Sequence, residues 1–226
     1  IGISDGGELK DFLDKIKAPG FFFDPVYNPS GQPRIGFGYF VGGILGLLLN
    51  LKILNYPKDK IISAINDIKI KEIENEAEQM AKKILNKYPY YIVSEFLTGV
   101  GNAIANQTNE TAKSISSFRV IPELNHHLME GLKNPKELAK ISLFIFFFSK
   151  LFSSPIQKRF YITKEVIKKN NIETTWYELK GQNKVEQVFE LMAFGNYLTM
   201  RLSSLYGENP VTVPYVDYFK KKLKEI

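Results

Sequence analysis

The chain has 226 residues, 44% hydrophobic and 24% charged, which is the ordinary balance of a globular protein with a substantial core. It has no cysteine, which excludes disulfides, thiolate nucleophiles and cysteine-based zinc sites and fits a reducing cytoplasm. The net charge of +6 suits an anionic metabolite. The clustered lysines fall at helical spacing typical of a solvated face, and no nucleic-acid motif accompanies them, so we expect no nucleic-acid partner.

The N-terminal quarter mixes short apolar runs with one long apolar stretch. We expect strands at residues 1–4 and 21–23, helices at 7–16 and 37–54, and a turn-rich connector at 27–32. The uncharged stretch 35–49 holds five glycines and is followed closely by Lys52. It is therefore a poor candidate for a span of about 20 apolar residues, and we expect no membrane partner.

After the Asn55–Pro57 break, strand-like and helix-like segments alternate. We expect one long or broken helix at 58–87, strands at 90–96, 119–121, 143–148 and 172–178, helices from the Gly99–Gly101 turn to 113, at 155–170 and at 184–206, and a final basic helix. Such alternation predicts a parallel α/β sandwich with three layers, whose ligands bind where strands end and helices begin. The domain boundary is expected between Leu54 and Lys58.

The stretch from Asn109 to Gly131 holds Glu110 and both histidines, His126 and His127. A carboxylate and an imidazole are well suited to move protons near neutral pH. Glu110 falls near a helix end and His126 just after a strand, so we expect the two to meet at one edge of the sheet. Adjacent histidines cannot chelate from one helical face, and no HExxH motif is present, so we expect no metal.

Two other features have competing interpretations. Gly99 and Gly101 follow a strand, but Ile104 stands where a dinucleotide fingerprint needs its third glycine, so we expect a tight turn with close helix packing and no nucleotide cofactor. Arg34 enters the apolar stretch beside glycines. Its guanidinium either caps local structure or holds an anion, such as a phosphate or an enolate-like oxygen.

Four stretches, in order, resemble the bifunctional phosphoglucose/phosphomannose isomerases, a branch of the sugar isomerase (SIS) superfamily. SDGGEL at 4–9 is similar to a strand-ending turn of the family, and QPR with GY at 32–39 to its PRxxxGY segment. NETAK with PELNH at 109–126 resembles its NENAK and PELNHNE signature, and GNYLT to GENP at 195–210 its GDYxS and GVDP segment. The third stretch is the most specific of the four.

The resemblance implies an SIS-type, flavodoxin-like fold and a cofactor-free reaction. Glucose 6-phosphate or mannose 6-phosphate would be interconverted with fructose 6-phosphate through a cis-enediol. Glu110 would transfer the proton, Arg34 would steady the enediolate, and His126 would assist ring opening from the other subunit of a homodimer. Thr199 is matched to a hydroxyl that accepts both epimers, and Asn125 to a substrate contact. A cytoplasmic location is implied as well.

The chain departs from the family pattern at several positions. His127 and Leu128 replace a polar–acidic pair, Asn196 and Asn209 replace aspartates, and Tyr206 stands where many members carry a basic residue. Tyr206, Leu128 and Asn196 favour the alternative, a non-catalytic, regulatory SIS module that binds a sugar phosphate. The retained Glu110, His126 and Arg34 favour the enzyme, because a module that only binds does not need the base.

The first residue also bears on the domains. Ile1 stands where a natural start would carry Met, so we expect an N-terminal portion with the phosphate-binding loop to be missing, with proteolytic processing as the alternative. Residues 1–56 would then be the remnant of a first SIS subdomain, and residues 57–226 a C-terminal SIS-type domain.

Overall fold

The computed structural model describes residues 1–225 and divides the chain into two compact units, Ile1–Ser63 and Ala64–Ile226. The division falls within helix α3 (Lys58–Asn66).

The first unit is built around a small parallel sheet. Its elements are β1 (Gly2–Ser4), α1 (Gly7–Lys15), β2 (Gly20–Phe22) and α2 (Phe37–Asn50). Strands β1 and β2 are parallel, with Gly2 opposite Gly20. Gly6 and Gly7 have φ values of 142° and 69°, a conformation that glycine adopts without strain, and they turn the chain from β1 into α1. Helix α2 ends earlier than the sequence suggested, at Asn50.

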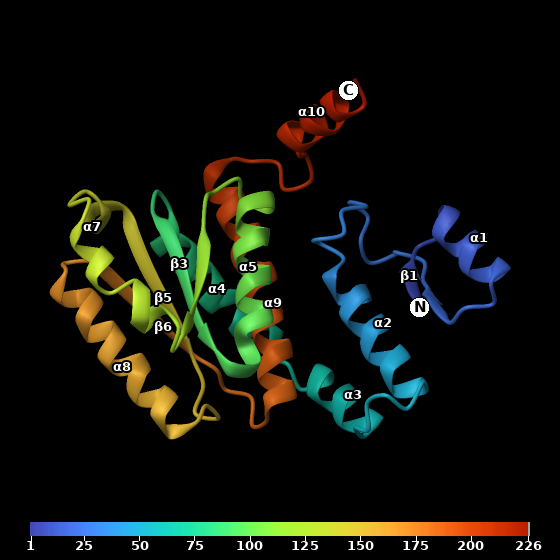
Figure 1. Cartoon of the computed structure of the whole chain (residues 1–226), viewed down its shortest axis with the longest axis horizontal. Coiled ribbons are helices and arrows are strands. Elements are labelled where there is room, and N and C mark those ends of the chain that lie inside the picture. Colours follow the sequence, from blue (N-terminus) through green and yellow to red (C-terminus); the bar gives the residue numbers. More distant parts are fainter. Residues whose placement is uncertain (226) are drawn as a thin grey trace. The chain divides into compact units, whose positions relative to one another are not determined.

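The second unit contains a four-stranded parallel sheet in the order β4-β3-β5-β6. Its strands are β3 (Tyr88–Ser94), β4 (Ser117–Ile121), β5 (Ser142–Phe148) and β6 (Glu173–Glu178). Helices α4 (Ile70–Ile84), α5 (Thr98–Thr111) and α9 (Lys184–Tyr206) form one outer layer, and α8 (Ser154–Lys169) lies on the other face of the sheet (Figure 1). The predicted three-layer α/β fold with a parallel sheet is confirmed.

The core of this unit is aromatic and centred on β5. All seven residues of β5 are buried, as expected of a central parallel strand covered on both faces. Phe144 stacks on Tyr90 of β3 with ring centroids 4.4 Å apart. On the opposite face, Phe194 of α9 packs against Tyr177 at 4.1 Å. The first pair joins two neighbouring strands, and the second holds α9 to the sheet.

The segment predicted as one long or broken helix is a broken one, with two helices, α3 and α4, separated by Asp67–Lys69. The sequence-based prediction was less accurate where β3 joins α5. A short 3₁₀ turn, Glu95–Leu97, follows β3, so Gly99 and Gly101 lie inside α5 and the predicted glycine turn is wrong. Close packing is confirmed for Gly101, where a Cβ atom would lie 2.6 Å from Cγ1 of Val93.

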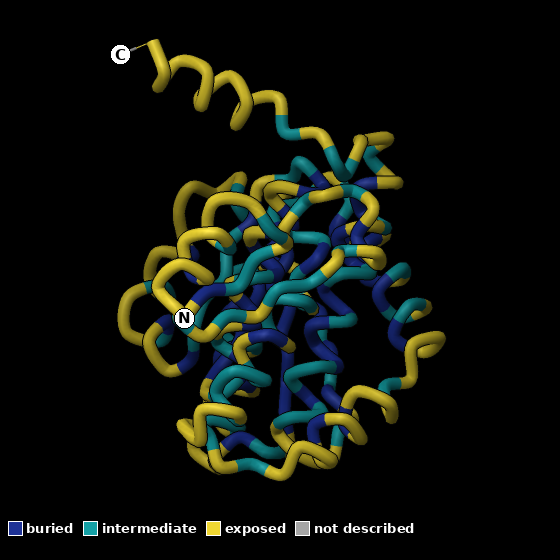
Figure 2. Tube along the Cα trace, turned by 90° about the vertical axis from the view of Figure 1, so that its right-hand side faces the viewer, coloured by how far each residue is buried: buried dark blue, intermediate teal, exposed yellow. Residues whose placement is uncertain are grey.

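The remaining elements lie outside these layers. They are α6 (Leu124–His127), a 3₁₀ turn (Glu130–Lys133), α7 (Leu138–Ile141) and α10 (Pro214–Leu223). None of the ten residues of α10 is buried, and this helix extends away from the sheet (Figure 2). Within residues 1–225, no helix has both the length and the apolar character that crossing a membrane requires.

Candidate functional site

Glu110 lines a cavity in the second unit, at the end of the sheet where the parallel strands begin (the amino edge). The cavity has a volume of about 600 Å³. Its lining comes from the end of α5 with the loop that follows it, and from the segment between α9 and α10: Asn109, Glu110, Lys113, Ser114, Ile115, Glu208, Thr212, Val213, Pro214, Tyr215 and Val216. The Glu110 side chain is exposed, so it is accessible to a substrate in this cavity.

The end of α5 is fixed by side chains on either side of Glu110. The Asn109 side-chain oxygen accepts a hydrogen bond from the backbone N–H of Ser116 at 2.8 Å, and the Ser116 hydroxyl donates to the carbonyl oxygen of Ala105 at 2.8 Å. Lys113 adopts a positive φ of 53°, and its Nζ donates to the carbonyl oxygen of Glu110 at 2.6 Å. The turn after α5 therefore holds Glu110 and Lys113 in the same cavity wall.

His126 lies at the opposite end of the strands, just after the carboxyl end of β4. It belongs to the short helix α6, whose Leu124 is buried while His126 and His127 are exposed. The Asn125 side-chain N–H donates to the Thr163 hydroxyl of α8 at 2.7 Å. In this chain, Asn125 therefore anchors the segment that presents His126.

Glu110 and His126 do not meet within one chain, so the expectation that they share one edge of the sheet is wrong. Helix α5 follows β3 and runs back to the amino edge, where Asn109 contacts Ser116 at the start of β4. His126 follows the carboxyl end of the same strand. The five residues of β4 separate the two edges by about 17 Å at roughly 3.3 Å per residue.

Arg34 belongs to the first unit and precedes α2. Its Nη1 donates to the side-chain oxygen of Gln32 at 2.8 Å, and the side chain is half-buried. The connector that carries it is fixed by Asn28, whose side-chain N–H donates to the carbonyl oxygen of Gln32 at 3.0 Å. A Cβ atom on Gly36 would lie 2.7 Å from that amide nitrogen, so the glycine permits the close approach.

Thr199 and the substituted family positions on α9 have structural contacts. Thr199 is only 2% exposed, and its hydroxyl donates to the carbonyl oxygen of Asn196 at 3.2 Å. The Asn196 side-chain oxygen accepts a hydrogen bond from Nε2 of Gln107 at 2.9 Å, which joins α9 to α5. Tyr206 accepts a hydrogen bond from the backbone N–H of Asn86. Asn196 and Tyr206, two of the residues that depart from the family pattern, thus have hydrogen-bond partners within the fold.

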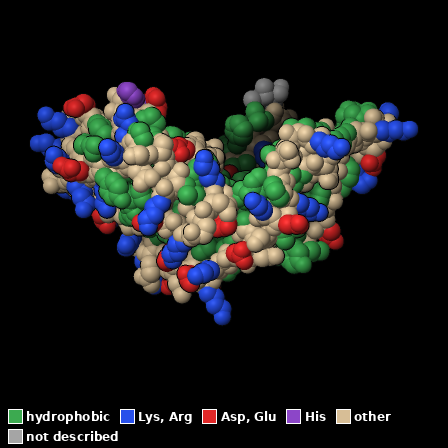
Figure 3. Space-filling view, turned by 90° about the horizontal axis from the view of Figure 1, so that it is seen from below, with side chains coloured by type: hydrophobic (Ala, Val, Ile, Leu, Met, Phe, Trp, Pro, Cys, Tyr) green, Lys and Arg blue, Asp and Glu red, His purple; other side chains and the backbone are tan. Residues whose placement is uncertain are grey.

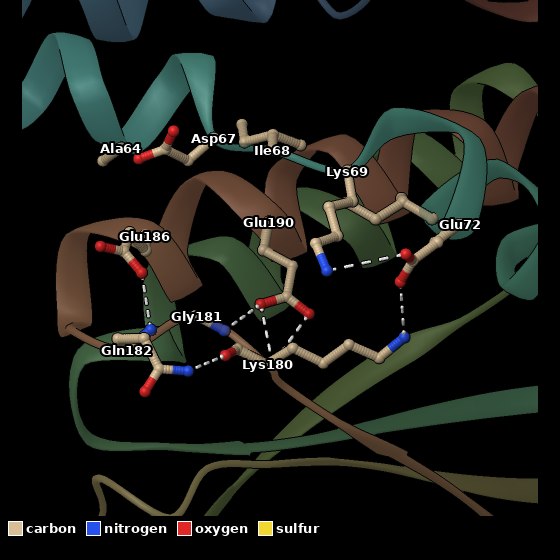
Figure 4. A pocket seen from close by; sticks show the side chains of 11 residues that line it. Ala64, Asp67, Ile68, Lys69, Glu72, Lys180, Gly181, Gln182, Glu186 and Glu190 are labelled. Atoms are coloured by element: carbon tan, nitrogen blue, oxygen red, sulfur yellow. Dashed lines mark hydrogen bonds and ion pairs between the residues drawn. The ribbon is translucent and has the colours of Figure 1, made fainter.

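A second cavity, of about 340 Å³, lies at the carboxyl edge beside β6 (Figure 4). It contains Glu190, a buried carboxylate that the sequence analysis did not identify. Glu190 accepts hydrogen bonds from the backbone N–H groups of Lys180 and Gly181, at 3.0 and 2.9 Å, and from the Tyr177 hydroxyl at 3.0 Å. Burial and then the neighbouring Glu190 charge raise the pKa of Tyr177 above its usual range. The sequence signal that could have identified Glu190 is its position as the single acidic residue in the apolar run around Leu191.

Glu190 holds the loop after β6 in place, and ion pairs lie around it. Lys180 Nζ lies 2.6 Å from Glu76 and 3.5 Å from Glu72, both on α4. On the face shown in Figure 3, lysine and arginine side chains are likewise scattered among acidic ones. Within residues 1–225, no group of three or more His, Cys, Asp or Glu residues is arranged to hold a metal ion.

Known proteins are similar to this chain in sequence and in fold. The family model described as the bacterial phospho-glucose isomerase C-terminal SIS domain matches residues 73–223. A bifunctional phosphoglucose/phosphomannose isomerase of Caldicellulosiruptor bescii is 29% identical over 237 residues, covering 100% of this chain and 68% of that protein. The corresponding Aquifex aeolicus enzyme is 24% identical, covering 99% and 67%.

A solved structure supports the fold at lower identity. The tagatose-6-phosphate ketose/aldose isomerase of Escherichia coli superposes with a TM-score of 0.64 at 13% identity, covering 92% of this chain and 60% of that one. The chain thus spans about two thirds of the length of these relatives. The family match extends over most of the second unit, from α4 to α10, and includes Glu110 and His126. The chain belongs to the family of the bacterial phosphoglucose isomerase C-terminal SIS domain.

Proposed function

We propose that this chain is part of an aldose–ketose isomerase that interconverts glucose 6-phosphate, mannose 6-phosphate or both with fructose 6-phosphate. The observation that carries the proposal is the accessible carboxylate of Glu110 in a cavity of about 600 Å³ at the end of α5. Relatives over the full chain are named phosphoglucose/phosphomannose isomerases, which supports the same reaction. A cytoplasmic location belongs to the proposal, since the chain has no cysteine to stabilise it in an oxidising compartment.

The chemistry requires one base that works in both directions. In the open-chain aldose, the Glu110 carboxylate removes the proton from C2. The electrons of that C–H bond form the C1–C2 double bond, and those of the C1–O1 double bond move to O1, which gives the cis-enediolate. A proton passes from the C2 hydroxyl to O1, the C2–O2 double bond forms, and protonated Glu110 returns its proton to C1, which gives the ketose. Arg34, by family resemblance, stabilises the negative oxygen of the intermediate, an electrostatic contribution that is often large in enzymes.

We place His126 in the active site of a partner subunit. Glu110 and His126 lie at opposite ends of β4, so one chain cannot bring both to the same sugar, whereas the two-fold symmetry of a homodimer can pair them. In this arrangement, His126 of one subunit transfers the proton that opens the hexose ring bound beside Glu110 of the other.

Mixed dimers test this arrangement directly. Glu110→Gln and His126→Ala subunits are each expected to be inactive as homodimers. A mixed dimer restores one complete site if the two residues act across the interface, so an equal mixture should recover about a quarter of the wild-type activity. No recovery, with mixed dimers shown to form, would place both residues in the same chain's site.

Thr199 and Asn125 are proposed as substrate-side residues of the same enzyme, from the family match. Thr199 is buried, so it would influence the acceptance of both epimers indirectly, by positioning the residues that contact the substrate. A Thr199→Val variant keeps the side-chain shape and removes the hydroxyl. A change in the ratio of glucose to mannose turnover would support the role, and an unchanged ratio would remove it.

The enzyme is distinguished from a regulatory sugar-phosphate-binding module by turnover. The full-length protein is supplied with fructose 6-phosphate, and glucose 6-phosphate and mannose 6-phosphate are followed separately. Formation of either aldose, lost in Glu110→Gln and retained in Glu137→Gln, establishes the isomerase. Glu137 is an exposed residue beside α7, distant in sequence from the cavity. Binding of fructose 6-phosphate without turnover would establish the module instead.

A further inference from the structure

We propose that Lys113 is a substrate-binding cation of the Glu110 cavity and contacts the oxygens on C1 and C2 of the sugar. The inference rests on the proposed isomerase function and adds a residue to its site. Negative charge develops on those oxygens when the C2 proton leaves, so a cation beside them stabilises the enediolate more than it stabilises the substrate.

The position of Lys113 relative to the base supports this role. Both residues line the same cavity, and Lys113 Nζ lies 2.6 Å from the carbonyl oxygen of Glu110. The base must reach hydrogens on C1 and C2, so the oxygens of these two carbons are the substrate atoms nearest to it.

The charge of the cavity lining supports it independently. The lining carries two carboxylates, Glu110 and Glu208, and the substrate is a phosphate ester that gains further negative charge during the reaction. Within the described part of the chain, Lys113 is the one lysine or arginine among the lining residues. Lys113 therefore places a positive charge in the cavity wall that carries these carboxylates and the carbonyl end of α5, which also repels anions.

A purely structural role for Lys113 has different consequences. A lysine after the last turn of a helix can stabilise the terminal carbonyl groups without touching any ligand. Loss of such a contact lowers the stability and leaves the affinity for ligands unchanged. Loss of an enediolate contact lowers kcat and weakens the binding of ligands that carry negative charge at the C1–C2 end.

The experiment compares Lys113→Met and Lys113→Arg with the control Lys133→Met, in the full-length protein. Lys133 is exposed at the end of the 3₁₀ turn Glu130–Lys133. Melting temperature, kcat and KM for fructose 6-phosphate are measured. Calorimetry gives the Kd of two ligands, a phosphorylated five-carbon aldonic acid whose carboxylate mimics the enediolate, and a phosphorylated hexitol that is uncharged at that end.

We expect Lys113→Met to lower kcat by about 100-fold, the size typical of losing one oxyanion donor. Its affinity for the aldonic acid phosphate should fall by about tenfold or more, while that for the hexitol phosphate changes little. Lys113→Arg should keep part of the kcat and part of the affinity for the aldonic acid phosphate. Lys133→Met should match the wild type in both.

Three results would overturn the role of Lys113. They are an unchanged kcat and aldonic acid affinity in Lys113→Met, a lower melting temperature as the sole effect, or equal losses for both ligands, which would place the contact at the phosphate. Failure of the isomerase proposal is separate, because it appears as absent turnover in the wild type. In that case the ligand comparison still reports whether Lys113 contacts the C1–C2 end.

Discussion

The phenol oxygen of Tyr206 accepts a hydrogen bond from the backbone N–H of Asn86 at 2.8 Å. The contact joins the end of α9 to the turn between α4 and β3, where Asn86 has a positive φ of 62°. The resemblance to the family implies a basic residue at the position of Tyr206, whereas in this chain the hydroxyl holds the turn. We therefore assign Tyr206 a structural role.

Removing the Tyr206 hydroxyl should reduce stability without reducing turnover. For Tyr206→Phe we expect a loss of about 1 kcal/mol in the free energy of unfolding, because one hydrogen bond to a constrained turn disappears. Urea denaturation measures this loss, and Tyr218→Phe, on the exposed helix α10, is the matched control. A large fall in kcat with unchanged stability would contradict the structural role and make Tyr206 part of the active site.

Gly101 and Gly99 should respond oppositely to the same added methyl group. A Cβ atom at Gly101 would lie 2.6 Å from Val93, so Gly101→Ala should destabilise the protein by about 1–3 kcal/mol through overpacking. At Gly99, nothing lies within 4 Å of the added atom, and alanine favours helix, so Gly99→Ala should stabilise by up to about 1 kcal/mol. Thermal unfolding of both variants measures the difference. Equal effects would show that α5 does not pack closely on β3 at Gly101.

Tyr177 should make the protein sensitive to alkaline pH. Burial and Glu190 raise its pKa in the folded state, while the unfolded chain ionises near the ordinary value of about 10. Its contribution to stability is therefore complete below that pH and falls by about 1.4 kcal/mol per pH unit above it. Tyr177→Phe loses a hydrogen bond, so it should be less stable than the wild type at neutral pH. The difference between the two free energies of unfolding should narrow as the pH rises above 10. Parallel stability curves would contradict this explanation.

The sheet could be predicted because its signals are local. Leu143 to Phe148 is apolar at every position and rich in phenylalanine, and a short run of this kind is typical of a strand covered on both faces. The glycines at 99 and 101 were misplaced because a glycine pair after a strand is compatible with a turn and with close helix packing alike. The intervening turn, Glu95–Leu97, contains neither glycine nor proline and gave no signal.

The site was harder to predict than the fold, although part of it followed from topology. Residues near the C-terminus of a helix that returns from one parallel strand to the next belong to the amino edge, so Glu110 could have been separated from His126. Arg34 could not be placed relative to Glu110 by such reasoning, because the two residues belong to different units. Lys113 was overlooked because a lysine after a helix is ordinary until the cavity shows what it faces.

The central claim is that Glu110 transfers the substrate proton, and hydrogen exchange with solvent tests it most directly. Glucose 6-phosphate is incubated in D₂O with the full-length wild-type protein, Glu110→Gln or Glu137→Gln, and deuterium at C2 of the recovered sugar and at C1 of fructose 6-phosphate is followed by NMR. We expect deuterium at both carbons with the wild type and Glu137→Gln, and none with Glu110→Gln, because glutamine cannot accept the proton. Exchange at the wild-type rate in Glu110→Gln, with the variant folded, would contradict the assignment.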